Sequence, residues 1–183
     1  YQLGKLQMMT GENKIGAQLI AEARTIAEDT GARELTAILS DQALALARIN
    51  ELDAAWQVAI DAEHRAGEEG NDFEHWSALQ TIAQIHNQRG RNQEALDTQL
   101  SAMPLARQLG LDDVMAESLG HLGSYLKELG RYEEAGEALQ QSLAIQGQGQ
   151  GQPNYALSAA TRNTLADMYI NLGNFEAARE NLL

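Results

Sequence analysis

Residues 126–139 read LKELGRYEEAGEAL, and residues 169–182 read YINLGNFEAARENL. The two stretches share a Leu-Gly pair, an aromatic residue, a glutamate, an alanine and a leucine at matching positions, while most other letters differ. A spacing that is kept while the letters change indicates that the geometry of the backbone is kept. The pair of stretches therefore predicts an internal structural repeat.

The same spacing extends through the chain. The turn position of the repeat recurs at intervals of 39, 40, 40 and 43 residues, at Gly11, Asn50, Gly90, Gly130 and Gly173. Five residues after each turn stands a small residue: Gly16, Ala55, Ala95, Ala135 and Ala178. Glycines that are expected to end helices form a second series with intervals of 39 and 40, at Gly31, Gly70 and Gly110. Two independent series with one period support a repeat of about 40 residues.

Between these turns the apolar residues recur at spacings of three and four, as in Leu119, Leu122 and Leu126. This period predicts amphipathic helices, so each repeat is expected to be a pair of antiparallel helices. Abundant Ala, Leu, Glu and Gln also favour helix over sheet. The expected helices are residues 1–9, 13–29, 33–48, 52–68, 72–88, 92–109, 113–128, 132–146, 155–171 and 175 to the end.

Two segments depart from this pattern. Residues 146–152 read QGQGQGQ and precede Pro153, which predicts a flexible loop over 146–153 and explains the longest repeat interval. Pro104 lies inside the expected helix 92–109, so we expect a bend near Ser101 to Pro104. The chain begins with Tyr and is still amphipathic at its end. We therefore expect residues 1–183 to be a single array of about four and a half helix pairs that belongs to a longer protein.

The composition argues against several classes of function. The chain of 183 residues has 13 Lys and Arg against 26 Asp and Glu, a formal charge of −13 that repels nucleic acid. It has no cysteine, which excludes disulfides and thiolate metal sites. No apolar run approaches the roughly 18 residues of a membrane span, and the first residues lack the apolar core of a signal peptide. We expect a soluble, cytoplasmic protein without a cofactor.

No motif for catalysis is present. The chain lacks a nucleophile elbow and a phosphate-binding loop. Glu117 and His121 have the spacing of two metal ligands on one helix, but no second pair accompanies them, so we expect no metal. His86 occupies a position where an aromatic residue is expected to pack, which favours a structural role. The sequence therefore predicts a protein that is not an enzyme.

The repeat resembles the tetratricopeptide repeat. The resemblance is carried by two sets of residues, Leu122-Gly123, Leu126, Gly130, Tyr132 and Ala135, and Leu165-Ala166, Tyr169, Gly173, Phe175 and Ala178. The usual unit of that family has about 34 residues. The longer unit is similar to the forms found in kinesin light chains, spindle-orientation adaptors and bacterial signal-transduction regulators. The resemblance implies an all-α, right-handed superhelical solenoid of antiparallel helix pairs with a concave groove.

Stripes of residues at i, i+4 and i+8 on the first helix of each pair are expected to line this groove. They read Ser40, Leu44, Arg48; Gln80, Gln84, Gln88; Gly120, Ser124, Glu128; and Asn163, Asp167, Asn171. The predicted peptide-binding residues are Arg48, Gln80, Gln84, Gln88, His121, Ser124, Asn163, Asp167 and Asn171. Carboxamides donate and accept, so they can pair with the main chain of an extended peptide. The same residues also suit any solvated helix surface.

The predicted function is a non-catalytic scaffold for a protein or peptide, which should be neutral or basic because the domain is acidic. Kinesin light chains are similar in placing an Asn near Asn163. Chaperone-binding members of the family hold a C-terminal carboxylate with a Lys and Asn clamp, but here Arg48 is the clearest basic residue of the stripes and no lysine matches, which argues against such a partner. Two alternatives remain open: a ligand- or peptide-sensing domain of a bacterial signal-transduction or transcription regulator, and a module that self-assembles through its repeat ends.

Overall fold

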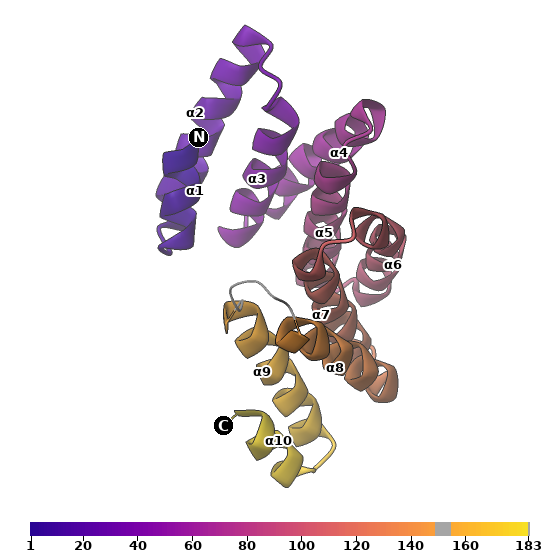
Figure 1. The fold of residues 1–183 in the computed structure, drawn as a ribbon. Helices are drawn as coiled ribbons and strands as arrows, with labels where there is room; N and C mark the ends of the chain where they lie inside the picture. The colour runs from indigo at the N-terminus through magenta and orange to yellow at the C-terminus, as the bar shows by residue number, and fades with distance from the viewer. Residues whose placement is uncertain (149–154, 183) are drawn as a thin grey trace. The chain divides into compact units, whose positions relative to one another are not determined.

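The computed structural model (Figure 1) describes residues 1–148 and 155–182. In these ranges the regular structure is entirely helical. The helices are α1 (Gln2–Met9), α2 (Asn13–Thr30), α3 (Leu35–Arg48), α4 (Leu52–Glu69), α5 (Asp72–Gln88), α6 (Asn92–Leu109), α7 (Asp112–Glu128), α8 (Tyr132–Gln148), α9 (Tyr155–Asn171) and α10 (Phe175–Leu182). The predicted all-α class is confirmed, and every predicted helix is present.

The chain divides into two compact units, Tyr1–Gly90 with α1 to α5 and Arg91–Leu183 with α6 to α10. In the first unit α1 packs on α2, α2 on α3, and α3 on both α4 and α5. In the second unit α6 packs on α7, α7 on α8, and α9 on both α8 and α10. Consecutive helices therefore pair within each unit, as a helical repeat requires. The continuity of one array over both units stays a prediction.

The turn residues adopt the backbone conformation that their identity predicts. The glycines that end α2, α4 and α6 are left-handed, with φ of 63°, 64° and 63°. The turns between paired helices use the same region, and there Asn50 has a φ of 64°. Asn50 is the one non-glycine residue with positive φ in the described part of the chain. Asn tolerates this region better than other side chains, so it can replace glycine at the turn.

Gly123 allows α7 and α8 to approach closely. A Cβ atom at Gly123 would lie 2.5 Å from Leu139 Cγ and 3.1 Å from the Ala135 carbonyl oxygen. The first helix pair has the same arrangement, because a Cβ atom at Gly16 would lie 2.9 Å from the Gly4 carbonyl oxygen. Small residues therefore mark close backbone contacts in both helix pairs.

The first unit has an alanine-rich core. Buried side chains of α3, α4 and α5 form one cluster: Leu39, Ala43, Ala47, Ala55, Val58, Ala59, Ala62, Ala78, Ile82 and Ile85. Trp56 packs against this cluster and meets the His86 ring edge-on, with 4.8 Å between ring centroids. His86 therefore fills the position of a packing aromatic, as predicted. The Arg89 guanidinium lies over the Trp56 ring, 5.6 Å from its centroid, and its Nη2 donates to the Leu52 carbonyl oxygen at 3.1 Å.

The core of the second unit contains polar side chains that bond to helix backbones. Gln99 of α6 is fully buried, and its Nε2 donates to the Ser118 carbonyl oxygen of α7 at 2.9 Å. Ser142 of α8 is also fully buried, and its Oγ donates to the Ala116 carbonyl oxygen of α7 at 2.6 Å. These bonds join three neighbouring helices through carbonyl groups that already accept within α7. Ser142 Oγ and Gln99 Nε2 are satisfied in this way, whereas the buried Gln99 Oε1 has no hydrogen-bond partner among the described residues.

Helix α8 is longer than the sequence predicts. It continues to Gln148, so the predicted loop over 146–153 does not begin at Gln146, and residues 149–153 lie outside the described residues. The Gln146 side chain explains the extension, because its Nε2 donates to Ser142 Oγ at 3.0 Å and its Oε1 accepts from Ser158 Oγ of α9 at 2.5 Å. Tertiary contacts therefore outweigh the glycine-rich composition at this helix end.

Helix α6 runs through Pro104 without interruption. The bend expected near Ser101 to Pro104 stays a prediction, because continuity alone does not measure the helix axis. Among the described helices, none combines the length and the apolar character that crossing a bilayer requires.

Candidate functional site

Burial along the predicted stripes changes in a regular way. On α3, α5 and α7 the first member of each stripe is buried: Ser40, Gln80 and Gly120. The middle member is half-buried: Leu44, Gln84 and Ser124. The last member is exposed: Arg48, Gln88 and Glu128. Two steps of four residues rotate the side chain by about 80° around a helix, so each stripe drifts from the packed joint to the surface.

Because of this drift, the predicted site residues differ in accessibility. Gln80 is only 6% exposed, so it lies among packed side chains rather than on the accessible part of its stripe. Gln84 and Gln88 form the accessible part on α5. On α9 all three members are exposed, and Asn163 lines a hollow shared with Asn181 and Leu182 of α10.

A further stripe lies on α1, where the sequence analysis placed none. The other stripes stand ten, six and two residues before their turn residues, and the same count back from Gly11 gives Tyr1, Lys5 and Met9. The repeat interval alone would have found them. The structure places Lys5 and Met9 around one pocket with Leu44 and Arg48 of the α3 stripe.

Asp41 connects the α1 and α3 stripes. Tyr1 Oη donates to Asp41 Oδ2 at 2.5 Å, and Lys5 Nζ lies 3.0 Å from the same oxygen. Burial raises the pKa of the Tyr1 hydroxyl, and its hydrogen bond to Asp41 raises it further. Tyr1 therefore remains a donor, and the charges of Lys5 and Asp41 largely compensate each other.

The first unit carries a second carboxyl group, that of Glu74, whose pKa is affected by the charge of Asp41. Burial raises the pKa of Glu74 on α5, a hydrogen bond with Ser40 of α3 lowers it, and the charge of Asp41 raises it again. Burial is the largest of these effects, so Glu74 is easier to protonate than a solvated glutamate. Ser40, the buried member of the α3 stripe, thus serves the contact between α3 and α5.

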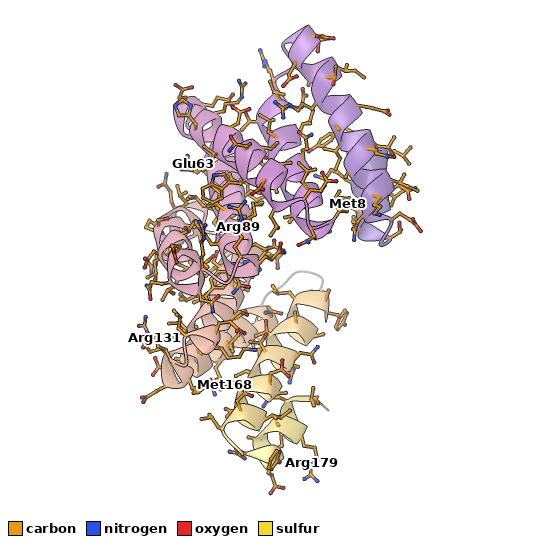
Figure 2. All side chains as sticks on the ribbon, turned by 180° about the vertical axis from the view of Figure 1, so that it is seen from behind. Met8, Glu63, Arg89, Arg131, Met168 and Arg179 are labelled. Atoms are coloured by element: carbon orange, nitrogen blue, oxygen red, sulfur yellow. The ribbon has the colours of Figure 1, made fainter. Side chains whose placement is uncertain are left out.

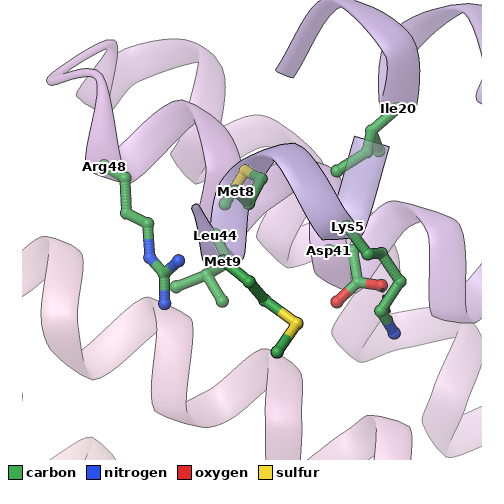
Figure 3. A pocket seen from close by; sticks show the side chains of 7 residues that line it. All are labelled: Lys5, Met8, Met9, Ile20, Asp41, Leu44 and Arg48. Atoms are coloured by element: carbon green, nitrogen blue, oxygen red, sulfur yellow. Dashed lines mark ion pairs between the residues drawn. The ribbon is translucent and has the colours of Figure 1, made fainter. Parts of the chain in front are cut away.

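Figure 3 shows the pocket between α1 and α3. Its volume is about 160 Å³. The apolar lining consists of Met8, Met9, Ile20 and Leu44, and the polar lining of Lys5, Asp41 and Arg48. Ile20 of α2 is 1% exposed and Met8 is 8% exposed, whereas Met9 is 83% exposed. The pocket therefore has a packed base and an open, flexible thioether at its edge.

The second unit presents a polar face on α7 and α9. Ser124 is half-buried, and its Oγ donates to the Gly120 carbonyl oxygen at 3.1 Å. Lys127 Nζ of α7 lies 3.9 Å from Asp167 Oδ2 of α9, which connects the two helices. His121 lies one turn before Tyr125, with 6.2 Å between the ring centroids, and burial lowers the pKa of His121.

Other charged side chains join neighbouring helices or lie on their surfaces. His75 Nε2 of α5 lies 2.9 Å from Glu63 Oε1 of α4, and Arg131, which directly precedes α8, pairs with Glu134 in the first turn of that helix. Figure 2 labels Glu63 and Arg131 among the side chains. In the described part of the chain, no three His, Cys, Asp or Glu side chains are grouped as metal ligands would be. The accessible polar residues of the stripes are therefore the principal candidates for binding.

Three solved structures are similar over 99% of this chain. A Rap protein complexed with Competence and Sporulation Factor has 19% identity and a TM-score of 0.90, with 50% of that chain covered. NprR in complex with its cognate peptide NprX has 24% identity and a TM-score of 0.81, with 52% covered. A Podosopora anserina chain described as a kinesin light chain with nearly identical TPR-like repeats has 18% identity and a TM-score of 0.71, with 89% covered. This chain thus spans about half the length of the Rap and NprR chains.

No match was found among curated proteins. A sequence model of the tetratricopeptide repeat matches residues 75–148 and 114–183, which together exceed half of the chain. The matched residues include the two stretches that revealed the repeat, and the antiparallel helix pairs are present in both units. This chain belongs to the tetratricopeptide repeat family.

Proposed function

We propose that this chain is a non-catalytic scaffold that binds a peptide or an extended protein segment along the first-helix stripes. The main support for this proposal is that each stripe has an accessible polar part. The predicted site residues in these parts are Arg48, Gln84 and Gln88 in the first unit, and Ser124, Asn163, Asp167 and Asn171 in the second. Each unit thus offers hydrogen-bonding groups on helices whose other faces are packed.

Hydrogen bonding to the peptide main chain is the proposed mechanism. Gln84 and Gln88 lie one turn apart on α5, so their amides follow each other along the helix. Each amide can donate to a peptide carbonyl and accept from a peptide N–H group. Of the similar proteins, NprR is bound to its cognate peptide NprX, and Rap is complexed with Competence and Sporulation Factor. This supports the same class of ligand here.

The remaining features of the proposal follow from charge and composition. A net charge of −13 favours a neutral or basic ligand overall. The absence of a catalytic motif in the sequence supports a binding role without chemistry. A cytoplasmic location remains part of the proposal.

A peptide display experiment tests this function. The chain is immobilised and used to select from a random heptapeptide library, and the selected peptides are bound to variants. Gln84→Ala with Gln88→Ala should weaken capture by about tenfold, because two hydrogen-bonding groups are lost. Gln57 and Gln141 are exposed on the second helices α4 and α8, so Gln57→Ala with Gln141→Ala is the matched control and should bind normally. Equal binding by the two double variants would remove the stripes from the mechanism.

Self-association is a second candidate, favoured by the exposed apolar residues of α1 and α10. Leu6 is 54% exposed, whereas the residues at its position in the other repeats are buried: Ala45, Ile85, Tyr125 and Met168. In α10, Leu182 is 59% exposed, whereas Leu139 at the same position of α8 is fully buried. The α1 face of one copy could therefore be covered by the α10 face of another, which gives a head-to-tail contact.

Light scattering over a range of concentrations tests this second candidate. The average mass should rise with concentration for the wild type and stay monomeric for Leu6→Glu. Leu100 is 50% exposed on α6, so Leu100→Glu adds the same charge elsewhere and should behave like the wild type. A wild-type mass that stays monomeric at all concentrations would exclude assembly through these faces.

A further inference from the structure

We infer that the groove between α8 and α9 binds an arginine side chain of a partner protein. The groove has a volume of about 410 Å³, and its lining includes Tyr132, Glu133 and Glu137 of α8 and Met168, Tyr169 and Leu172 of α9. The α9 residues of the groove lie roughly 100° to 200° around the helix from Asp167, so the groove is on a different side from the stripe of that helix. The inference therefore adds a second binding surface and does not depend on the proposed function.

The first unit holds a guanidinium of its own at the corresponding contact, between α4 and α5. The Arg89 guanidinium of α5 lies 5.6 Å from the centroid of the Trp56 ring of α4. Arg89 Nη2 also donates to Asp53 Oδ1 at 2.5 Å and to the Leu52 carbonyl oxygen at 3.1 Å. The Arg89 side chain is only 20% exposed. An aromatic ring, a carboxylate and a carbonyl group of α4 thus hold a guanidinium that α5 supplies.

The contact between α8 and α9 keeps the carboxylate but lacks the arginine. Counted from the turn residues, Glu133 stands at the position of Asp53, whereas Leu172 stands at the position of Arg89. Leu172 carries no charge and is 53% exposed. A guanidinium that completes the same arrangement must therefore come from another molecule.

The carboxylates of this groove are available to such a ligand. Glu133 and Glu137 lie one turn apart on α8, and neither side chain forms an ion pair or a hydrogen bond with the described residues. Their like charges repel each other, and a bound cation removes this repulsion. Both side chains are exposed, so the groove covers only one side of a ligand. This suits an arginine that a second protein surface carries and covers from the other side, rather than a small molecule, which is usually enclosed.

Aromatic rings complete the lining of the groove. Gly136 stands at the position of Trp56, so the large ring of the contact between α4 and α5 is absent and space is left there. Instead, Tyr132 of α8 and Tyr169 of α9 are half-buried in the lining. The face of an aromatic ring attracts a guanidinium, and the apolar surface of Met168 suits the methylene groups of an arginine.

The corresponding groove between α2 and α3 shows that the fold does not impose this chemistry. Its volume is also about 410 Å³, but Lys14 and Leu46 stand there in place of Glu133 and Tyr169. The shape of the groove is therefore common to the repeats, whereas the groups that bind a cation belong to α8 and α9.

Methyl NMR with protein labelled at the methionine methyl groups tests the inference. Met168, which Figure 2 labels, is 3% exposed and lines the groove, whereas Met103 of α6 does not and serves as the internal reference. N-acetyl-arginine amide should shift the Met168 signal until the site is saturated and leave Met103 unchanged. N-acetyl-citrulline amide has nearly the same shape without the charge and should bind about five- to tenfold more weakly.

Two double variants test the carboxylates. Glu133→Gln with Glu137→Gln should bind N-acetyl-arginine amide about five- to tenfold more weakly than the wild type. Glu94→Gln with Glu180→Gln removes two exposed charges elsewhere in the same unit and should bind like the wild type. Equal binding by the two double variants would overturn the inference.

A variant that supplies its own guanidinium tests the site in the opposite direction. Leu172→Arg places an arginine at the position of Arg89, so it should fill the groove and block the probe, whereas Leu172→Gln should still bind it. Unchanged binding by Leu172→Arg, an absent Met168 shift in the wild type, or equal binding of the arginine and citrulline probes would likewise refute the assignment.

Discussion

Gly123 and Gly136 are both helical glycines, but packing requires only the first. A Cβ atom at Gly123 would lie 2.5 Å from Leu139 Cγ and 3.1 Å from the Ala135 carbonyl oxygen. A Cβ atom at Gly136 would lie 3.5 Å from Met168 Cε, which is an ordinary contact. The close packing of α7 on α8 thus requires glycine at position 123 and leaves room for a Cβ atom at position 136.

Alanine substitutions at these two positions should have opposite effects. Gly123→Ala should lower the free energy of unfolding by roughly 1–3 kcal/mol, because α7 and α8 must separate to relieve the overlap. Gly136→Ala should raise it by about 0.5–1 kcal/mol, because alanine is the better helix former. Urea denaturation of both variants measures the difference. Equal effects would show that the close approach of α7 and α8 does not limit stability.

His121 should make stability depend on pH. Burial lowers its pKa below the ordinary value of 6.5, so the unfolded chain binds its proton at higher pH than the folded chain. The contribution of neutral His121 is therefore complete above pH 6.5 and is lost as the pH falls from 6.5 through the folded pKa. Melting temperatures at pH 7.5, 6 and 5 should fall less for His121→Gln than for the wild type. A parallel fall in both proteins would assign the pH dependence to other groups.

At the scale of secondary structure, α6 carries a proline where the helix would gain from an amide donor. Pro104 cannot bond to the carbonyl group of Leu100, and its ring crowds that group. Pro104→Ala should therefore raise the free energy of unfolding by about 1–3 kcal/mol, as measured by chemical denaturation. Pro104 also reduces the conformational entropy of the unfolded chain, which stabilises the folded wild type. Loss of this effect opposes the gain. A decrease in stability would mean that the restriction is the larger effect.

The helices could be predicted from the sequence because their ends are set locally. Gly31 and Asn50 mark left-handed residues in the structure, and the apolar spacing between such residues sets the buried face. The true end of α8 could not be predicted, because Gln146 is held by Ser142 and Ser158 from its own and the next helix. Such contacts cannot be inferred from the composition of the local sequence.

The candidate site was less predictable than the helices. The sequence placed Gln80, Gln84 and Gln88 on one stripe, but helical drift and the neighbouring helices leave Gln80 6% exposed and Gln88 accessible. The pocket beside Arg48 also required the fold, because α1, α2 and α3 all contribute to its lining. Periodicity gives the side of a helix on which a residue lies, whereas accessibility depends on what packs against it.

The chain as a whole is strongly acidic, but it also carries a basic residue and an apolar pocket that are candidates for binding. Its net charge of −13 favours neutral or basic partners, yet Arg48 supplies one available cation beside an apolar pocket. Together these features favour a peptide that is neutral or basic along its length. We propose that such a ligand lies on the first helices of the repeats.

Side-chain amide NMR tests this claim most directly. A peptide selected from the heptapeptide library is added to ¹⁵N-labelled protein, and the glutamine NH₂ signals are followed. Gln84 and Gln88 on α5 should shift on binding, while Gln57 on α4 and Gln141 on α8 should not. Shifts confined to Gln57 and Gln141 would contradict the claim, because the ligand would then lie on the second helices.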